Sequence, residues 1–367
     1  MLIGSQLGKI IKTRSFAPRL ESFGRFSFAV AVVGLAGAGL SCAGGSTNNG
    51  SGGSSGSTAG GSTSGGDAFY KPCAESMRIG AFSLELKPAD MGNQAYSQVT
   101  GGVRDGVVPR TSWVEESVNG SGKECRLMVG QSSACSPACT SPQVCTGTTC
   151  QNQPVSKSVG EVTFSGLTIP VMMTPMITGT GSVVYSGLIP SDTTFPPYTV
   201  GAQLGLMATG ADYPAFMLSG RGIQPLEAVA GQTLYVAKDQ PLTIQWVAPQ
   251  TGAGRIKLSM DIGHHGGVAA ELHCDNLPDS GSVTIAAPLI TALMNKGTSG
   301  FPTLSLSRVS VDSTSVGPGC VEFSVASGVS LALNVAGVLS CTEDADCAPP
   351  EICRPAGVPN GLSCGMP

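Results

Sequence analysis

The sequence predicts an all-β fold, with one or more antiparallel β-sandwich units and small disulfide-rich modules, preceded by a signal peptide and a disordered linker. The composition is the first reason. Charged residues make up 12% of the 367 residues and hydrophobic residues 41%, so Ser, Thr, Gly and Asn must supply most of the polar surface. Helices usually carry Glu, Lys and Arg on their exposed faces, so this composition is more typical of an extracellular β protein. The second reason is a series of short alternating apolar and polar runs, separated by Gly and Pro.

Residues 1–41 are predicted to be a lipoprotein-type signal peptide. A basic region precedes the apolar run Phe26–Ser41, which is short for a membrane-spanning helix. The run ends in Gly-Leu-Ser-Cys, and this ending is similar to the lipobox of bacterial lipoproteins, although Leu40 stands at position −2 from the cysteine. The resemblance implies acylation of Cys42. The alternative is ordinary signal-peptide cleavage, for instance after Ala38, which leaves Cys42 unmodified.

Residues 42–66 continue from this cysteine as a Gly/Ser-rich linker. The segment after Cys42 has no charged, aromatic or large apolar side chain, so it has nothing to bury and should remain flexible. A chain of about 24 such residues spans roughly 25–30 Å on average. A tether in this place holds a folded domain off a membrane. We therefore expect an exported protein, anchored by lipid at the bacterial outer membrane or cell surface, with the membrane as one partner.

The charge of the chain argues against nucleic acid as a partner. The formal net charge is −4, and residues 1–41 hold an excess of basic side chains, so the processed chain is more acidic still. It contains no run of Lys and Arg. Binding to phosphate backbones needs a basic patch, which this sequence does not offer.

The 13 cysteines indicate a disulfide framework, because twelve remain for six bridges if Cys42 carries lipid. Outside two local clusters, we expect Cys73 to pair with Cys125 and Cys274 to pair with Cys320. The clusters contain no C-x₂-C spacing, and no histidine is near the first, so disulfides are favoured over zinc. Their members are Cys135, Cys139, Cys145 and Cys150 in the first cluster, and Cys341, Cys347, Cys353 and Cys364 in the second.

The folded part of the chain divides by composition into four segments. They are a first β segment (67–130), a Cys-rich insert (131–154), a β-sandwich region (155–340) and a Cys-rich C-terminal module (341–367). The two cysteine modules and the tether resemble those of cysteine-rich bacterial surface lipoproteins, which implies a location and not an activity. Separately, LTIQWVAP followed by RIKLSMDI is similar to a strand pair of immunoglobulin- or fibronectin-like sandwiches, with Trp246 in the core. That resemblance concerns the fold alone.

Within the sandwich region, Ile256–Ile262 and Val268–Cys274 alternate clearly and predict a hairpin. If Ile262 pairs with Val268, Cys274 lies opposite Ile256, and His273 lies opposite Lys257 on the exposed face. Further along the chain, a proline precedes a predicted short helix at Leu289–Met294. The alternation slips at Arg308, which predicts a β-bulge.

The histidines of this hairpin are the candidate binding residues. His264 and His265 occupy its tip, and the functional interpretation is a metal or catalytic site that includes them with His273 or Asp261. Adjacent residues at a tip diverge, and His273 lies roughly 17 Å back along the strand. We therefore favour turn residues that tolerate unusual backbone angles among glycines.

The sequence DNLPDSG is predicted to be the next turn, and it carries the second pair of candidate binding residues, Asp275 and Asp279. Their oxygens suit Ca²⁺, but a plain Asx turn is the simpler interpretation. We expect no other cofactor or metal.

Motifs of common enzymes are absent from the folded region: G-x-S-x-G before a helix, phosphate-binding loops and H-E-x-x-H. We expect a non-enzymatic, lipid-anchored surface protein with an adhesive, ligand-binding or envelope-structural role, whose ligand is a surface glycan or a protein. The alternative is a secreted or anchored hydrolase or metal-dependent enzyme with its site near His264 and His265.

Overall fold

The structure is a computed structural model that describes residues 69–365 with internal gaps. The gaps are 90–93, 110–112, 120–123, 132–134, 191, 251–253, 264–268, 299–301, 337–340, 348, 350–351 and 356–361. The predicted signal peptide, Cys42, the linker and the tip residues His264 and His265 lie outside the described residues. What was expected of them stays a prediction.

The described residues form β-sheets and one short α-helix, α1 (Ala287–Met294), which confirms the all-β prediction. The helix begins two residues before the predicted start, with proline in its first turn. Among the described residues, no helix has the length and apolar character that a membrane crossing needs.

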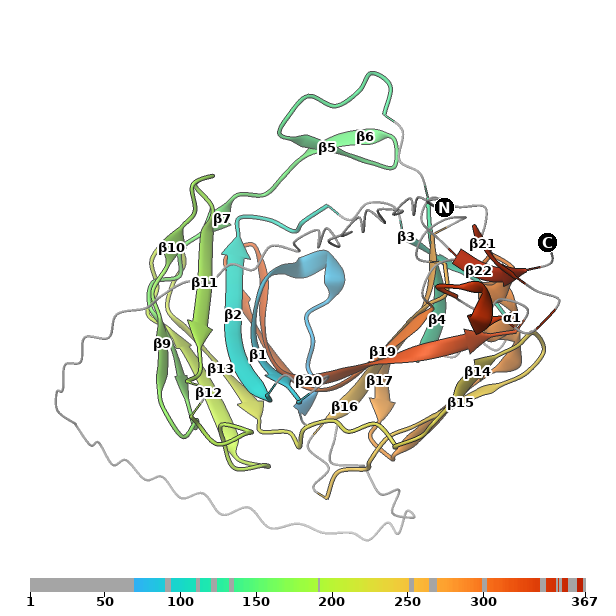
Figure 1. Cartoon of the computed structure of the whole chain (residues 1–367). Coiled ribbons are helices and arrows are strands. Elements are labelled where there is room, and N and C mark those ends of the chain that lie inside the picture. Colours follow the sequence, from blue (N-terminus) through green and yellow to red (C-terminus); the bar gives the residue numbers. More distant parts are fainter. Residues whose placement is uncertain are drawn as a thin grey trace, which may run out of the picture. The chain divides into compact units, whose positions relative to one another are not determined.

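The largest sheet has twelve strands (Figure 1). Its main order is β10 (Met176–Ile177), β11 (Val183–Leu188), β2 (Tyr96–Arg104), β1 (Arg78–Lys87), β20 (Gly319–Val335), β19 (Thr303–Val316), β16 (Arg255–Asp261), β17 (Ala270–Pro278), β4 (Cys125–Gly130) and β3 (Trp113–Glu116). Two further strands, β14 (Leu234–Val236) and β7 (Ser156–Lys157), pair with β20 and β2.

The remaining strands form four smaller sheets. One has the order β13 (Phe216–Arg221), β12 (Gln203–Ala208), β8 (Val162–Ser165) and β9 (Val171–Met173). The other three are strand pairs: β15 (Leu242–Gln245) with β18 (Ser282–Ile285), β5 (Gln143–Thr146) with β6 (Thr149–Asn152), and β21 (Ile352–Pro355) with β22 (Leu362–Gly365). Two 3-10 helices are η2 (Glu75–Met77) and η3 (Asp344–Asp346).

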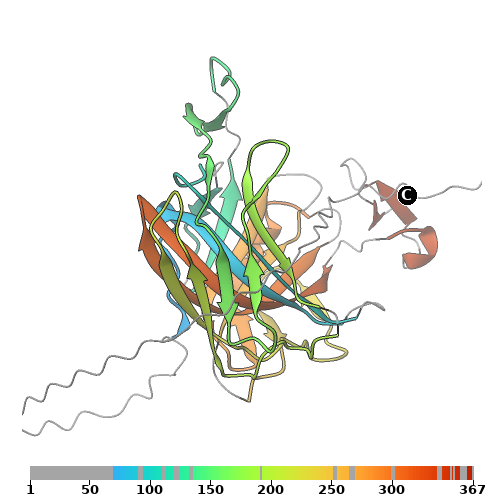
Figure 2. The same ribbon diagram turned by 90° about the vertical axis from the view of Figure 1, so that its left-hand side faces the viewer.

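The large sheet is mixed, whereas the sequence predicts antiparallel units. Both β1 and β14 pair with β20 in parallel. In both views the blue strand β1 runs beside the orange-red strand β20 (Figure 1, Figure 2). A hairpin can only join antiparallel neighbours, whereas a parallel pair needs a long connection. The strands β1 and β20 lie near opposite ends of the described chain, so no tight turn constrains their direction.

Two hydrophobic cores share the large sheet. In the first core, side chains of β1, β2, β11 and β20 pack against the four-stranded sheet, as in a sandwich. In the second core, side chains of β4, β16, β17 and β19 pack against β14, β15, β18 and α1. The long strand β20 contributes Phe323 to the first core and Leu333 to the second.

Polar side chains on β19 and β20 bind the end of β13 and the chain segment that follows it. Hydroxyl and carboxylate oxygens of Asp312, Ser310 and Ser327 accept the backbone N–H groups of Ser219, Arg221 and Leu226, at 2.8, 3.0 and 2.9 Å. Backbone N–H groups that are not bonded to a neighbouring strand need other acceptors when they are buried. The sheet therefore holds this segment by polar contacts between the two apolar regions.

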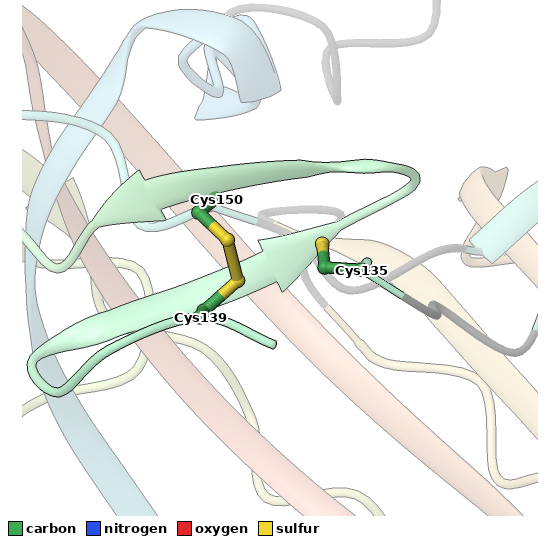
Figure 3. Close-up of side chains that lie close together, drawn as sticks. All are labelled: Cys135, Cys139 and Cys150. Carbon is green, nitrogen blue, oxygen red and sulfur yellow. A yellow bond between two sulfur atoms is a disulfide. The ribbon is translucent and has the colours of Figure 1, made fainter. Parts of the chain in front are cut away.

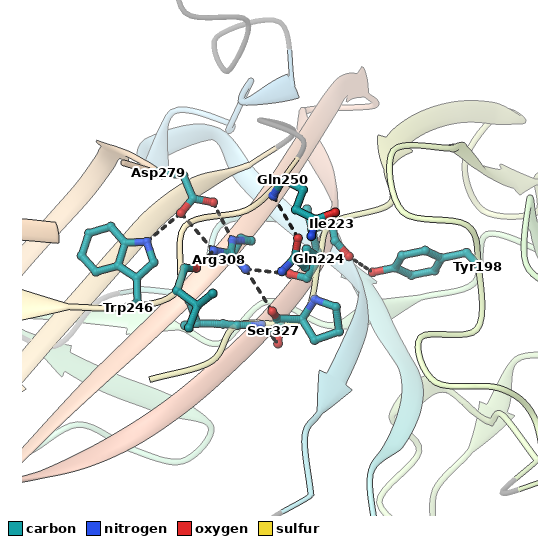
Figure 4. A network of polar contacts seen from close by, with 11 residues as sticks. Tyr198, Ile223, Gln224, Trp246, Gln250, Asp279, Arg308 and Ser327 are labelled. Atoms are coloured by element: carbon teal, nitrogen blue, oxygen red, sulfur yellow. Dashed lines mark hydrogen bonds and ion pairs between the residues drawn. The ribbon is translucent and has the colours of Figure 1, made fainter. Parts of the chain in front are cut away.

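Arg308 occupies the same part of β19, on the face that carries Leu304 and Leu306. All five of its N–H groups are bonded: two to the carboxylate of Asp279, at 2.5 and 3.1 Å, and three to backbone carbonyls of Gln224, Pro225 and Val247, at 2.8 to 3.0 Å (Figure 4). The predicted bulge at this position is wrong, because the registers of β19 with β16 and β20 are continuous. Arg308 interrupts the apolar pattern as a buried ion pair and not as an irregularity of the backbone.

Two disulfides involve strands of the large sheet, and they differ from the predicted pairs: one ties the segment before η2 to β20, and the other joins β4 to β17. Cys73 is bonded to Cys320, and Cys125 to Cys274. The second bond follows from strand order, because Cys125 and Cys274 occupy paired positions on β4 and β17. The pairing of β4 with β17 brings together cysteines that are 149 positions apart, so the spacing of cysteines in the sequence does not predict this bond.

The two cysteine clusters are stapled locally, as predicted. In the insert the bonds are Cys135–Cys145 and Cys139–Cys150, and in the C-terminal module they are Cys341–Cys353 and Cys347–Cys364. Each module has a two-stranded sheet of its own, and segments of this size have too little core to fold without covalent links.

The hairpin of β16 and β17 has a different register from the predicted one. Cys274 pairs with Leu258 instead of Ile256, and His273 pairs with Ser259. The shift is two residues. Because side chains alternate with a period of two, such a shift keeps each residue on its predicted face of the sheet.

The predicted turn at residues 275–281 is shorter than expected, since β17 continues to Pro278. A β-bulge places Asp275 and Asn276 together opposite Lys257. Asn276 has a φ of 59°, in the left-handed region that Asn tolerates better than most residues. The bulge therefore lies in β17, beside the candidate site described next.

Candidate functional site

The structure separates the two predicted carboxylates. Asp275 lies on the exposed face of β17, and its Oδ2 accepts from Arg126 Nη2 at 3.0 Å. Asp279 is buried and accepts from Arg308 and from the indole N–H of Trp246, the latter at 2.7 Å (Figure 4). Each carboxylate has its own cationic partner, so the two do not form a shared calcium site.

The cysteine clusters bring sulfur atoms close enough to resemble metal sites. The sulfurs of Cys135, Cys139 and Cys150 lie within 4.8 Å of one another, and so do those of Cys341, Cys347 and Cys364. The bond between Cys139 and Cys150 ties the loop before β5 to the strand β6 (Figure 3). A sulfur in a disulfide is not a thiolate, the form that binds zinc, so both clusters act as staples.

A groove on the outer face of β4, β16 and β17 is lined mainly by charged and polar side chains. Its volume is about 480 Å³, within the range of roughly 300–1,000 Å³ typical of small-molecule sites. The lining residues come from five separate parts of the chain: Glu75, Arg78, Pro109, Trp113, Arg126, Met128, Lys257, Glu271, His273 and Asp275.

Strand register explains why these residues share one face. Arg126 pairs with His273, and Met128 pairs with Glu271, across β4 and β17. Their sequence neighbours Leu127 and Leu272 point the other way, into the second core. The same alternation that fills the core therefore presents a row of charged side chains outside.

Several polar and charged groups of the groove are paired with one another. Arg126 Nη2 lies 3.0 Å from the carboxylate of Asp275 and 4.0 Å from that of Glu75. His273 Nε2 lies 2.7 Å from Glu271 Oε2. The lining holds three cationic side chains and three carboxylates, so the groove has no marked net charge at neutral pH.

Two contacts connect this network to residues near the start of the described chain. Arg78 pairs with Glu322 at 3.2 Å, and Glu322 also accepts the backbone N–H of Cys73 at 2.8 Å. The amine of Lys257 lies 5.7 Å from the ring centre of Tyr70. Burial raises the pKa of Tyr70 to about 12, and the negative charges of Asp275 and Glu322 add to that rise.

Trp113 supplies an aromatic surface at the groove. It lies on β3, and 39% of its surface is exposed. Its partner on β4 is Gly130, which has no side chain to cover a ring. The second tryptophan, Trp246, is only 2% exposed and belongs to the second core.

The sequence contains few signs of this groove. His273, Lys257 and Glu271 have the pattern of an ordinary exposed strand face, and only their outward direction is predictable. Arg126 and Trp113 lie more than 120 positions away from β17 in the sequence, and the pairing of β4 with β17 is what brings them to the site. The predicted tip residues His264 and His265 are outside the described part of the chain.

The chemistry of the groove suits recognition. Guanidinium, imidazole and carboxylate groups can hydrogen-bond a polar ligand, and the indole can cover an apolar face. None of the ten described lining residues is a Ser, Thr or Cys, so these ten offer no hydroxyl or thiol nucleophile beside His273. Comparisons with protein-family models, with curated proteins and with solved structures find no match to this chain.

Proposed function

We propose that this chain is a non-enzymatic protein of the bacterial cell surface, anchored by lipid on Cys42, that binds an external ligand in the groove of β4, β16 and β17. The composition of the groove is the observation that supports a binding role. It combines an exposed indole with charged groups whose positions are fixed by mutual pairing. Preorganised groups lose little entropy when a ligand binds, which favours a binding role.

The location rests on the cysteines and on the N-terminal sequence. Twelve cysteines form six disulfides, and such bonds persist in oxidising compartments outside the cytoplasm. The remaining cysteine, Cys42, follows the predicted export signal and precedes the Gly/Ser linker. One acyl chain alone gives marginal membrane binding, whereas several chains on a terminal cysteine hold a protein stably.

The anchor is tested by Cys42→Ser in the full chain. We expect the wild type to enter the detergent phase on phase separation, and the variant to stay in the aqueous phase. Surface protease treatment of intact cells should remove the wild-type protein. If both forms partition alike, Cys42 is not the anchor.

The binding role is tested by screening the full chain with Cys42→Ser against arrays of purified glycans and peptides. The matched variant adds Arg126→Ala and His273→Ala, which remove two groove side chains from the exposed face and none from the core. We expect at least one class of ligand to bind the parent chain and to be lost with the groove variant. Binding by neither chain, or by both equally, contradicts a function at this groove.

A further inference from the structure

The geometry points to a neutral oligosaccharide as the ligand of the groove, with one sugar ring stacked on Trp113. This inference rests on the proposed function and names its ligand class. It depends on three features: the balance of charge, the fixed donors and acceptors, and the exposed indole.

The balance of charge disfavours an ionic ligand. Arg126 faces both Asp275 and Glu75, and the imidazole of His273 faces Glu271, so Arg126 and these three carboxylates each have a polar partner within 4.0 Å. An anionic ligand that binds Arg126 has to displace a carboxylate from it, and a cationic ligand that binds Asp275 has to displace the guanidinium. A neutral ligand leaves the pairs intact.

The paired groups still offer hydrogen bonds to such a ligand. Within the described residues, the contacts of Arg126 involve its Nη2 atom, and guanidinium has further donors on Nη1 and Nε. The carboxylate of Asp275 has about four acceptor sites, of which its contact with Arg126 uses only a part. A sugar hydroxyl is both donor and acceptor, so it can bridge adjacent members of a charged pair. Hydrogen bonds to charged groups are about twice as strong as neutral ones.

The indole supplies the apolar half of the site. One face of a pyranose ring presents C–H groups, and the negative face of an aromatic ring attracts the positive edges of C–H bonds. Trp113 lies beside the charged row, so a sugar can place its C–H face on the ring and its hydroxyls toward Arg126 and His273. Met128 adds an apolar contact in the same lining.

The test uses the full chain with Cys42→Ser and measures both heat and tryptophan emission. The neutral probes are cellohexaose, xylohexaose, mannohexaose and chitohexaose, and hexagalacturonate is the anionic probe. We expect saturable binding of at least one neutral probe and a shift in emission. Only Trp113 can report the shift directly, because Trp246 is buried and bonded to Asp279.

Three variants locate the binding. Trp113→Ala should weaken the neutral probe about tenfold, a loss within the range expected for an aromatic contact. Trp113→Phe should retain most of the heat while the emission shift disappears. The matched control is Tyr235→Ala, which removes an exposed aromatic side chain of β14 outside the groove, and it should leave the affinity unchanged.

The outcomes separate this inference from the proposed function. If hexagalacturonate or a charged peptide binds, no neutral probe does, and Arg126→Ala abolishes that binding, the groove is a binding site and the neutral-glycan inference is wrong. It is also wrong if a neutral probe binds equally to Trp113→Ala. If no probe, glycan or peptide binds through the groove, both the inference and the proposed function are overturned.

Discussion

At the scale of single residues, the pair of Arg308 and Asp279 is the most buried ionic contact of the chain that the structure describes. The two side chains are 1% and 3% exposed, and every N–H group of Arg308 has an acceptor. A buried charge is tolerated only when it is paired and fully hydrogen-bonded. The three carbonyls that Arg308 binds belong to loop segments, so the pair orders the backbone around it.

Asp279→Ala should destabilise the protein by about 3–5 kcal/mol, because it leaves the guanidinium of Arg308 buried without a counter-charge. Urea unfolding with the disulfides intact measures the loss. Adding Arg308→Met to this variant should recover part of it, since an apolar pair avoids the uncompensated charge. Asp192→Ala, at an exposed carboxylate, is the control and should change stability by less than about 0.5 kcal/mol. If Asp279→Ala costs no more stability than this control, the buried ion pair does not have the predicted role.

Tyr70 should ionise later than an ordinary tyrosine, because burial and the charges of Asp275 and Glu322 raise its pKa to about 12. A raised folded-state pKa means that this residue's contribution to stability is complete below pH 10 and is lost as the pH rises toward 12. Absorbance of phenolate at alkaline pH, as wild type minus Tyr70→Phe, gives the midpoint. In urea the midpoint should return to about 10. A midpoint near 10 in the folded protein would show that Tyr70 is not shielded.

At the scale of elements, the alternation of apolar residues predicts which side of a strand is buried but not which strand lies beside it. In β17, Leu272 and Cys274 are buried and His273 faces outward, as the alternation requires. The register with β16 is nevertheless two residues from the predicted one, since a shift of two leaves the pattern unchanged. The same limit produced the wrong pairs for Cys125 and Cys274. Their bond depends on which strands meet, and that is decided by packing of the whole sheet.

The disulfide between β4 and β17 should stabilise the fold more than a disulfide of the insert. Replacing Cys125 and Cys274 by Ser opens a link across 149 residues, and loss of such a bond costs about 2–5 kcal/mol. Replacing Cys135 and Cys145 opens a link across 10 residues in an insert whose described residues belong to neither core. That second change should leave the unfolding midpoint of the main fold almost unchanged. Guanidinium unfolding of both double variants measures the two losses of stability. Equal losses would contradict the prediction.

At the scale of the whole molecule, the described fold has two cores on one continuous sheet. The strands β19 and β20 extend through both: Val316 and Phe323 belong to the first core, and Leu306 and Leu333 to the second. Backbone pairing between these two strands is unbroken along their length. Unfolding of one core should therefore disrupt the backbone pairing of β19 and β20, which also contribute side chains to the other core. The composition of the chain predicts strands and sandwiches, but this sharing depends on contacts between the two ends of the described chain.

Coupling of the cores can be measured by perturbing the first core and observing the second. Phe164 is buried in the first core with its ring 5.5 Å from that of Phe323, so Phe164→Ala should cost about 3–5 kcal/mol. In a Trp113→Phe background, Trp246 alone reports on the second core.

If the sheet couples the cores, Phe164→Ala lowers the unfolding midpoint reported by Trp246 by the same amount as that reported by far-ultraviolet circular dichroism. The control is Met217→Ala on the four-stranded sheet, where the side chain is 73% exposed and little should change. An unchanged Trp246 midpoint, with an earlier separate transition in the circular dichroism, would mean two independently folding units. Shared strands make the single transition the expected result, because β20 cannot lose its pairing beside Phe323 without loosening the same strand beside Leu333.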